Sequence, residues 1–181
     1  MPSKADLDLS ELLGFLELVS EQLPRPITLV AAGGTAMTLL GLKASTKDID
    51  FTGPREDIAA FQAALRSLPH GMKVDVWPDG QVFSQILPSD YLDRSRKIRR
   101  LGRVDLRALH PLDIVLSKMG RLDERDEQDI EACIRGSNLT RSALARRAAQ
   151  VQYAGNEENY RYHVTLVLRR HFKSRSRVRR R

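Results

Sequence analysis

The sequence predicts an α/β (α+β) fold in which a small mixed β-sheet core precedes a C-terminal helical subdomain. Three observations support this prediction. Short apolar runs fill the first 109 residues, glycine and proline separate them, and only helical spacing follows His110-Pro111. We therefore expect a core over residues 1–109, a helical subdomain over 110–172 and a basic disordered tail over 173–181.

Helices and strands alternate in the expected core. Apolar residues at helical spacing predict a first helix over about 8–22, which Pro24 ends. The apolar run 27–32 fits a buried strand, after which the chain turns into a short helix over 36–42. The remaining expected elements are, in order, strand 48–52, helix 54–68, strands 72–77, 82–87, 97–101 and 104–109, and helices 111–122, 124–136, 140–153 and 156–172.

Positive charge is concentrated in two segments. The 181 residues include 30 Lys and Arg against 23 Asp and Glu. Eight bases and no acid lie in 169–181, and six bases and no acid lie in 94–103, so the rest of the chain is acidic. Two such segments suggest a polyanionic partner such as RNA. The alternative is a solvated face followed by a tail without a partner.

Several classes of protein are excluded by composition. No stretch approaches the roughly 20 apolar residues that span a bilayer, and the acids near the N-terminus are unlike the apolar region of a signal peptide. The single Cys133 excludes an intramolecular disulfide framework and a cysteine-rich metal site. We therefore expect a soluble, cytoplasmic protein with no membrane partner.

Asp48 and Asp50 lie two residues apart in an expected strand. Because strand side chains alternate between faces, both carboxylates point the same way, with Cα atoms roughly 7 Å apart. Like charges at this spacing repel unless a cation lies between them, and Mg²⁺ prefers carboxylates, water and phosphate oxygens. The pair therefore predicts a site for Mg²⁺ or Mn²⁺, where two ions about 4 Å apart activate a hydroxyl and stabilise a departing pyrophosphate.

A third carboxylate is expected on a neighbouring strand. Asp75 is the first candidate because β-branched residues bracket it and its strand is the next one predicted after the acid pair. Asp105, in Val-Asp-Leu, is the alternative. In either case the third carboxylate would help to bind the metal and to deprotonate the acceptor.

Gly33, Gly34 and Thr35 directly follow an expected strand and open a helix. Glycine lets the backbone approach a phosphate closely, and the N–H groups of a helix N-terminus favour anions. Thr35 adds a hydroxyl donor, and Lys47, beside the acid pair, offsets phosphate charge. A glycine pair alone more often marks a tight turn, so the prediction rests on its spacing from the acids.

The motif Gly33-Gly34 followed, after thirteen residues, by Asp48-Ile49-Asp50 resembles the DNA polymerase β-like nucleotidyltransferase superfamily. The longer strings over 32–37 and 43–51 look most like the AbiEii-type toxin nucleotidyltransferases. The segments 110–118 and 125–129 are similar to downstream elements of that group, although Asp123 stands in place of an Arg and Arg125 in place of a Lys.

The resemblance implies transfer of a nucleoside monophosphate from a nucleoside triphosphate such as ATP to a hydroxyl, with release of pyrophosphate. The acceptor would be the 3′ end of an RNA such as tRNA, or a protein hydroxyl in a toxin–antitoxin or defence system with an antitoxin partner. The resemblance also implies that Lys118, Asp126 and Asp129 line the cleft, with Lys118 contacting phosphate. Without it, these residues are an ordinary charged helix surface on which Arg125 pairs with Asp129.

Two other functions stay open. One is a nucleic-acid- or partner-binding module on a degenerate transferase scaffold, which a separation of more than about 8 Å between Asp75 and the acid pair would favour. The other is an antitoxin that sequesters another protein. We expect His110 to be a turn residue before Pro111, and Trp77 and Cys133 to be packing residues.

Overall fold

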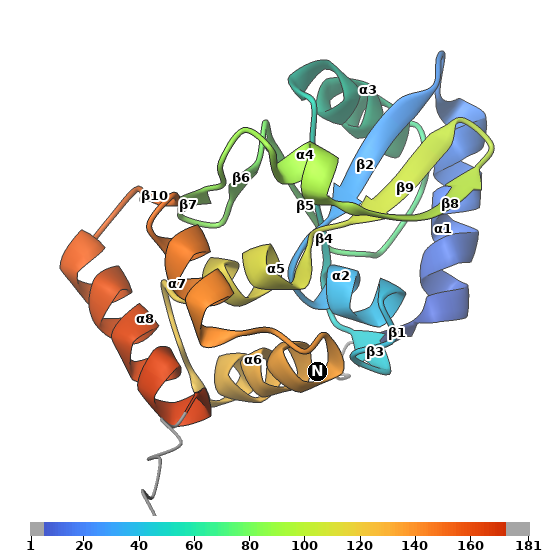
Figure 1. Cartoon of the computed structure of the whole chain (residues 1–181). Helices are drawn as coiled ribbons and strands as arrows, with labels where there is room; N and C mark the ends of the chain where they lie inside the picture. Colours follow the sequence, from blue (N-terminus) through green and yellow to red (C-terminus); the bar gives the residue numbers. More distant parts are fainter. Residues whose placement is uncertain (1–5, 173–181) are drawn as a thin grey trace, which may run out of the picture.

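The computed structural model describes residues 6–172, and Figure 1 shows its elements. The helices are α1 (Leu9–Gln22), α2 (Gly33–Leu39), α3 (Arg55–Arg66), α4 (Tyr91–Arg94), α5 (Pro111–Ser117), α6 (Glu124–Gly136), α7 (Arg141–Ala148) and α8 (Glu157–His171). The strands are β1 (Leu7–Asp8), β2 (Ile27–Ala31), β3 (Ser45–Thr46), β4 (Ile49–Gly53), β5 (Val74–Pro78), β6 (Gln81–Val82), β7 (Gln85–Ile86), β8 (Arg96–Leu101), β9 (Val104–Ala108) and β10 (Gln152–Tyr153). The tail expected over 173–181 lies outside the described residues.

Five strands form a mixed central sheet in the order β5-β4-β2-β9-β8. β4 runs parallel to β5, and β2 runs parallel to β9. The pairs β2–β4 and β8–β9 are antiparallel. Because helices follow this mixed sheet in the chain, the predicted α/β (α+β) fold class is confirmed. The sequence did not reveal three short elements: α4 and the paired strands β1 and β3.

The first helix begins at a capping box. The Asp8 carboxylate accepts a hydrogen bond from the backbone N–H of Glu11, and the Glu11 carboxylate accepts one from the N–H of Asp8, both at 2.9 Å. This exchange satisfies two donors that a helix start otherwise leaves free. Leu12 and Val19, one side of the helix, are fully buried, and Pro24 follows its C-terminal end.

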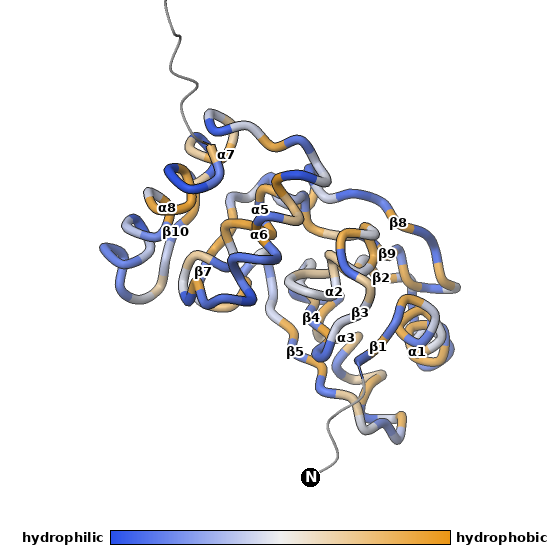
Figure 2. The backbone as a smooth tube through the Cα atoms, turned by 90° about the horizontal axis from the view of Figure 1, so that it is seen from below, coloured by the Kyte–Doolittle hydropathy of each residue, from blue (hydrophilic) through white to orange (hydrophobic). Residues whose placement is uncertain are grey.

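The hydrophobic core lies between the sheet and the helices that cover it. α1 and α3 pack against each other and against the sheet, while α2 packs on β4 and on α5. Phe51 of β4 and Phe61 of α3 are fully buried, with ring centroids 5.5 Å apart in an edge-on arrangement. Burying side chains of this size stabilises the fold by roughly 1.5–3 kcal/mol each. Figure 2 shows hydrophobic residues along the central strands and a mostly hydrophilic β8.

Two sequence predictions are wrong because strands of two residues form there only through their pairing with other strands. The single strand expected over 82–87 is a hairpin, in which β6 and β7 flank the two residues Phe83 and Ser84. The helix expected over 140–153 ends at Ala148, and the following β10 pairs with β7. A three-stranded sheet, β10-β7-β6, therefore links the C-terminal helices to the core. None of the helices within 6–172 is long and apolar enough to cross a membrane.

A buried ion pair joins α5 to α7. Arg147 donates to both carboxylate oxygens of Asp113, at 2.6 and 3.0 Å, and to Asp90 Oδ1 at 2.6 Å. Asp113 is fully buried, and Arg147 is almost fully buried. Two-point pairing suits the planar guanidinium, which keeps the desolvated carboxylate fully bonded. The pair therefore fixes α7, and with it the approach to β10, relative to the core.

We predict that Arg147→Met lowers the free energy of unfolding by about 3–5 kcal/mol, because it leaves the Asp113 carboxylate buried without its partner. The double variant Asp113→Leu/Arg147→Met should recover most of that loss, since no unpaired charge remains. Urea denaturation at pH 7 measures both changes. Additive losses in the double variant would contradict the proposed coupling of the two side chains.

Candidate active site

The pairing of β4 with β5 brings three carboxylates together. Asp48 lies immediately before β4, and Asp50 is in register with Asp75 of the parallel β5. Neighbouring positions on adjacent strands lie about 5 Å apart, inside the 8 Å or so that two-metal geometry tolerates. Asp105 lies elsewhere, on β9, where it pairs in register with Thr28.

A lysine bridges two of these acids. Lys73 Nζ lies 2.9 Å from Asp75 Oδ2 and 3.9 Å from Asp48 Oδ1. Lys73 precedes Asp75 by two residues, so the two side chains share a face of the strand. The ammonium group offsets negative charge at the point where the two carboxylates converge. The pKa of Lys73 is raised, first by its hydrogen bond to Asp75 and then by the charge of Asp48.

Asp50 carries the strongest electrostatic signature of the site. Its side chain is buried, with 7% of the residue exposed, and its pKa is raised from 3.8 to about 7. Burial is the largest cause, followed by the negative charges of Asp75 and Asp48, while Lys73 and Lys118 act in the opposite direction. A carboxyl whose pKa is raised by burial and by two neighbouring carboxylates marks a candidate functional site.

The two glycines allow the chain to pass close to these acids. Gly33 has a φ of +51°, and a Cβ at that position would lie 2.8 Å from Asp50 Oδ2. A Cβ on Gly34 would lie 2.7 Å from Thr46 Oγ1. Any side chain at either position would push on the groups that hold the acids. The glycines therefore set the close approach of α2 to β4.

The hydroxyl of Thr35, which we expected to donate to a phosphate, is instead bonded to the protein backbone. It is fully buried, and its hydroxyl donates to the carbonyl oxygen of Asp48 at 3.1 Å while it accepts from the N–H of Asp50 at 2.9 Å. Thr46 also donates to the Asp48 carbonyl, at 2.9 Å. Both threonines therefore hold the backbone that carries the acid pair. Lys47 lies exposed beside Asp48.

A charged network approaches the acids from the helical side. Lys118, nearly buried after α5, lies 2.7 Å from Asp129 and 3.3 Å from Asp126. Lys43 donates to both oxygens of Asp129, at 3.1 and 3.3 Å. Asp129 therefore pairs with these two lysines. In the described part of the chain, the pair between Arg125 and Asp129 that an ordinary charged helix surface predicts is not formed. Lys118 is close enough to lower the pKa of Asp50.

Local geometry accounts for two further positions. Asp123 caps α6 and accepts from the N–H of Asp126 at 2.9 Å. His110 caps α5, where Nδ1 accepts from the N–H of Leu112 at 3.2 Å. Burial and the charge of Arg94 lower the pKa of His110. These contacts are structural, as expected for a turn residue before a helix.

Sequence reasoning missed two contributors to the site. Lys73 could have been found, because the period of two that places Asp48 beside Asp50 also places Lys73 beside Asp75. Phe83 gave no such signal. Its ring lies against Trp77, with centroids 4.9 Å apart, and its Cζ is 3.4 Å from the position that a Cβ of Gly33 would take.

The donor set suits a hard divalent cation. Asp48, Asp50 and Asp75 offer only oxygen ligands, which Mg²⁺ and Mn²⁺ prefer. Across 6–172, no three His, Cys, Asp or Glu side chains already surround a common metal position. Instead the Lys73 ammonium lies between two of the acids and supplies the positive charge there. The residues therefore fit a metal whose binding would displace Lys73.

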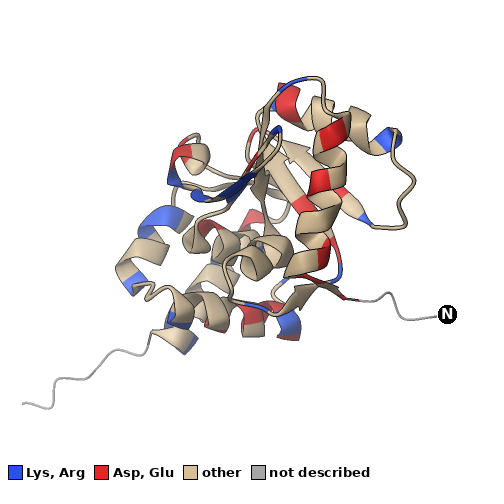
Figure 3. Cartoon of the chain, turned by 90° about the vertical axis from the view of Figure 1, so that its right-hand side faces the viewer, with Lys and Arg blue, Asp and Glu red and all other residues tan. Residues whose placement is uncertain are grey.

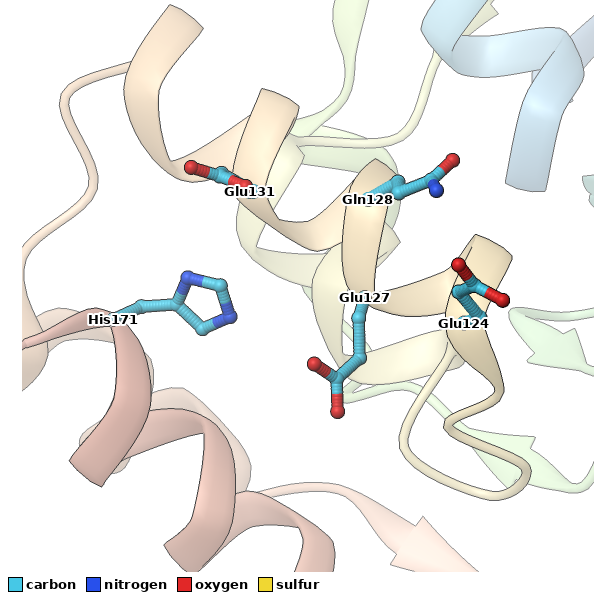
Figure 4. A pocket seen from close by; sticks show the side chains of 5 residues that line it. All are labelled: Glu124, Glu127, Gln128, Glu131 and His171. Carbon is cyan, nitrogen blue, oxygen red and sulfur yellow. The ribbon is translucent and has the colours of Figure 1, made fainter.

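A separate hollow lies away from the carboxylates of β4 and β5. Figure 4 shows it between α6 and α8, with a volume of about 500 Å³, and its lining consists of Glu124, Glu127, Gln128, Glu131 and His171. The α6 residues occupy a different side of that helix from Asp126 and Asp129. Arg170 pairs with Glu127 across the hollow. Since the carboxylates of β4 and β5 do not border it, we assign it no part in the chemistry.

Comparison with known families agrees with this geometry. A family model described as a nucleotidyltransferase of unknown function (DUF6036) matches residues 8–177. The chain belongs to this family. Comparison with curated proteins and with solved structures gave no match. Membership of this nucleotidyltransferase family supports a general role in nucleotidyl transfer, with a nucleotide as substrate.

We predict that Asp50→Asn stabilises the metal-free protein above pH 7. Because the pKa of Asp50 is raised from 3.8 to about 7, the folded state binds more protons than the unfolded state between these values. The free energy of unfolding therefore falls as pH rises through that window. At pH 8 the variant should be more stable than the wild type by roughly 1–3 kcal/mol.

Urea denaturation in a chelating buffer at pH 4.5 and pH 8 measures this difference. The advantage of Asp50→Asn should shrink at the lower pH, where the wild-type carboxyl is protonated in the folded state. Asp105→Asn, a change on β9 away from the acid cluster, is the matched control. An equal stability gap at both pH values would count against a raised pKa of Asp50.

Proposed function

We propose that the protein is a metal-dependent nucleotidyltransferase that moves a nucleoside monophosphate from a nucleoside triphosphate to a hydroxyl acceptor. The observation that carries this proposal is the register of Asp50 with Asp75, which places them beside Asp48 next to Gly33. The acceptor oxygen forms a bond to the α-phosphorus, and the bond from that phosphorus to the bridging oxygen breaks. Pyrophosphate leaves, and the hydroxyl proton passes to a carboxylate of the site.

The carboxylates divide the work by position. Asp48 and Asp50 would hold both metal ions, and Asp75 would hold the ion next to the acceptor and take part in removing its proton. Bound Mg²⁺ or Mn²⁺ would supply positive charge to the phosphate oxygens. Lys73 must first leave Asp75, which its exposed side chain allows. Its ammonium then remains nearby to offset charge on the triphosphate.

The triphosphate would lie between the glycines and the helical side of the site. Gly33 and Gly34 present backbone without side chains close to Asp50. Lys118 is nearly buried, and its charge already acts on Asp50. Phosphate oxygens there would compete with Asp129 for its ammonium group. Lys47, exposed beside Asp48, would reach the same anion from the solvent side.

The acceptor that the charge distribution favours is a nucleic acid, with an RNA 3′ end as our choice. The edge strand β8 exposes four bases in a row of six residues: Arg96, Lys97, Arg99 and Arg100. No ion pair within residues 6–172 involves any of the four. Figure 3 shows this basic strand beside the acidic α1. Unpaired bases on an exposed edge suit a phosphate backbone.

The strand register places the start of β8 at the same end of the sheet as the acids. Ala31 of β2 pairs with Phe51 of β4 on one side and with Ala108 of β9 on the other. Ala108 in turn pairs with Arg96. Arg96 and the acid-bearing start of β4 therefore lie at the same end of the sheet. An RNA held along β8 would present its terminus toward the metal site about three strand spacings, roughly 15 Å, away.

Two alternatives are separated by the same assay. The AbiEii-type resemblance favours a protein hydroxyl as acceptor in a toxin–antitoxin or defence system, with an antitoxin partner. The bridge from Lys73 to Asp48 and Asp75 favours a degenerate scaffold that only binds nucleic acid. In that case the ammonium would permanently take the place of the metal.

We expect the wild-type protein to transfer label from at least one α-labelled nucleoside triphosphate in the presence of Mg²⁺ or Mn²⁺. Total cellular RNA and protein serve together as acceptors, and nuclease or protease treatment identifies which carries the label. Asp48→Ala/Asp50→Ala should reduce transfer by at least 100-fold or so, because electrostatic stabilisation of this kind is worth several kcal/mol. Asp105→Ala should retain it.

If only protein carries the label, the acceptor is a protein hydroxyl and not an RNA 3′ end. Transfer that is equal in the wild type and the Asp48→Ala/Asp50→Ala variant would remove the acids from the mechanism. Retention of RNA by a folded protein that transfers no nucleotide would establish the binding module instead.

A second prediction concerns β8. Changing Arg96, Lys97, Arg99 and Arg100 to Gln should weaken RNA binding and flatten its salt dependence, by about 0.7 in the log–log slope for each phosphate that the strand no longer neutralises. Nucleotide affinity should stay unchanged, because β8 lies three strands from β4. Filter binding over a range of KCl concentrations measures the slope. Changing four exposed bases of α3, α6 and α7 to Gln (Arg66, Arg125, Arg141 and Arg146) controls for net charge, and an unchanged slope in the β8 variant would exclude this strand.

A further inference from the structure

An exposed aromatic side chain stands at the rim of the acid cluster. Phe83 is 44% exposed and lies in the two-residue connection between β6 and β7. Its φ is +53°, a conformation that glycine or asparagine adopts far more readily than a bulky residue. Large apolar side chains at such positions store backbone strain, which occurs most often where a side chain has a binding role.

Phe83 lies next to the acid cluster, between Trp77 and Gly33. Its ring packs on Trp77 at 4.9 Å between centroids, with the planes inclined by 58°. Trp77 follows Asp75 by two residues on β5, so both side chains lie on the same face of the strand. The Cζ atom of the Phe83 ring lies 3.4 Å from the position that a Cβ of Gly33 would take. The aromatic pair therefore borders the space in front of Asp50 and Asp75.

The hairpin that carries Phe83 is firmly anchored. Val82 and Gln85, the residues that flank the connection, are fully buried. The Gln85 amide, in the orientation that satisfies its bonds, donates to the carbonyl oxygens of Val82 and Ser117 at 3.0 and 3.2 Å. The carbonyl of Ser84 accepts from the N–H of Ala154 at 2.8 Å. Figure 1 shows this hairpin between β5 and β10.

We infer that the exposed ring of Phe83, which packs on Trp77, is the platform on which the base of the nucleoside triphosphate stacks. The inference rests on the proposed function, since it places the triphosphate at Gly33 and the metal at the acids. A nucleotide joins a flat base to a polyanion, and this rim sets the flat ring of Phe83 beside carboxylates that suit a divalent cation. The platform is preorganised, so little ordering cost opposes stacking.

Stacking has a consequence for selectivity. Every base has a π-face, so an aromatic platform adds affinity without reading hydrogen-bond donors and acceptors. The contribution of Phe83 should therefore be shared by all four nucleotides. It should be absent for a ligand that has phosphates and no base. This difference separates base stacking from a general effect of Phe83 on the shape of the site.

Trp77 makes the test direct because it is the only tryptophan in the chain. The full-length protein is titrated in Mg²⁺ with α,β-methylene analogues of the four nucleoside triphosphates, which cannot transfer, and with inorganic tripolyphosphate. Calorimetry gives affinities, and tryptophan fluorescence reports contact at the platform. The variants are Phe83→Ala, Phe83→Leu, which keeps apolar bulk, and Phe83→Tyr, which keeps the ring.

We expect nucleotides to quench Trp77 and tripolyphosphate to bind with little quenching. Phe83→Ala and Phe83→Leu should weaken nucleotide binding roughly 5- to 100-fold and leave tripolyphosphate affinity unchanged, whereas Phe83→Tyr should bind like the wild type. Equal nucleotide affinity in the wild type and Phe83→Ala would overturn the platform alone. So would an equal loss for tripolyphosphate. A wild type that binds no nucleotide by calorimetry would overturn the proposed function as well.

Discussion

The crowding of three carboxylates at one end of the sheet is the constraint around which the neighbouring structure is arranged. Pairing of β4 with the parallel β5 sets Asp50 beside Asp75, and burial then makes the charge of Asp50 costly. The neighbouring residues accommodate the buried carboxylate of Asp50 in two ways. Lysines approach from opposite sides, Lys73 from β5 and Lys118 from the helical part. Glycines at 33–34 let α2 pass close without adding side chains.

This arrangement links ligand binding to the stability of the fold. Under the proposed function, a cation bound between the carboxylates would make this charge favourable, so the free energy lost in folding would be recovered on binding. The threonines matter for the same reason. Thr35 and Thr46 fix the carbonyl of Asp48, which prevents the acid-bearing segment from relaxing away from its neighbours. These hydrogen bonds hold the backbone of the site, whereas the side chain of Lys73 is exposed.

The order of elements and the acid pair could be predicted from the sequence because both depend on local spacing. Local spacing could not show whether Asp75 or Asp105 lies near the acid pair, because that depends on which strand lies beside β4. The strand order β5-β4-β2-β9-β8 is a property of the whole sheet. The hairpin at 81–86 and β10 were mistaken for a longer strand and a helix, because strands of two residues exist only through their pairing. The position of Phe83 follows from that hairpin and was missed with it.

Under the proposed function, three surfaces would recognise the substrates, and each comes from a different part of the fold. The aromatic pair of Trp77 and Phe83 belongs to β5 and the hairpin, the lysines that face the acids from the helical side belong to α2–β3 and α5, and the basic strand β8 lies at the far edge of the sheet. In-line displacement requires the acceptor and the departing pyrophosphate on opposite sides of the phosphorus. A nucleotide held between the hairpin and Lys118 would leave the β2–β9–β8 side for the acceptor. Since these surfaces share no side chain, substitutions can change nucleotide affinity, catalysis and acceptor binding separately.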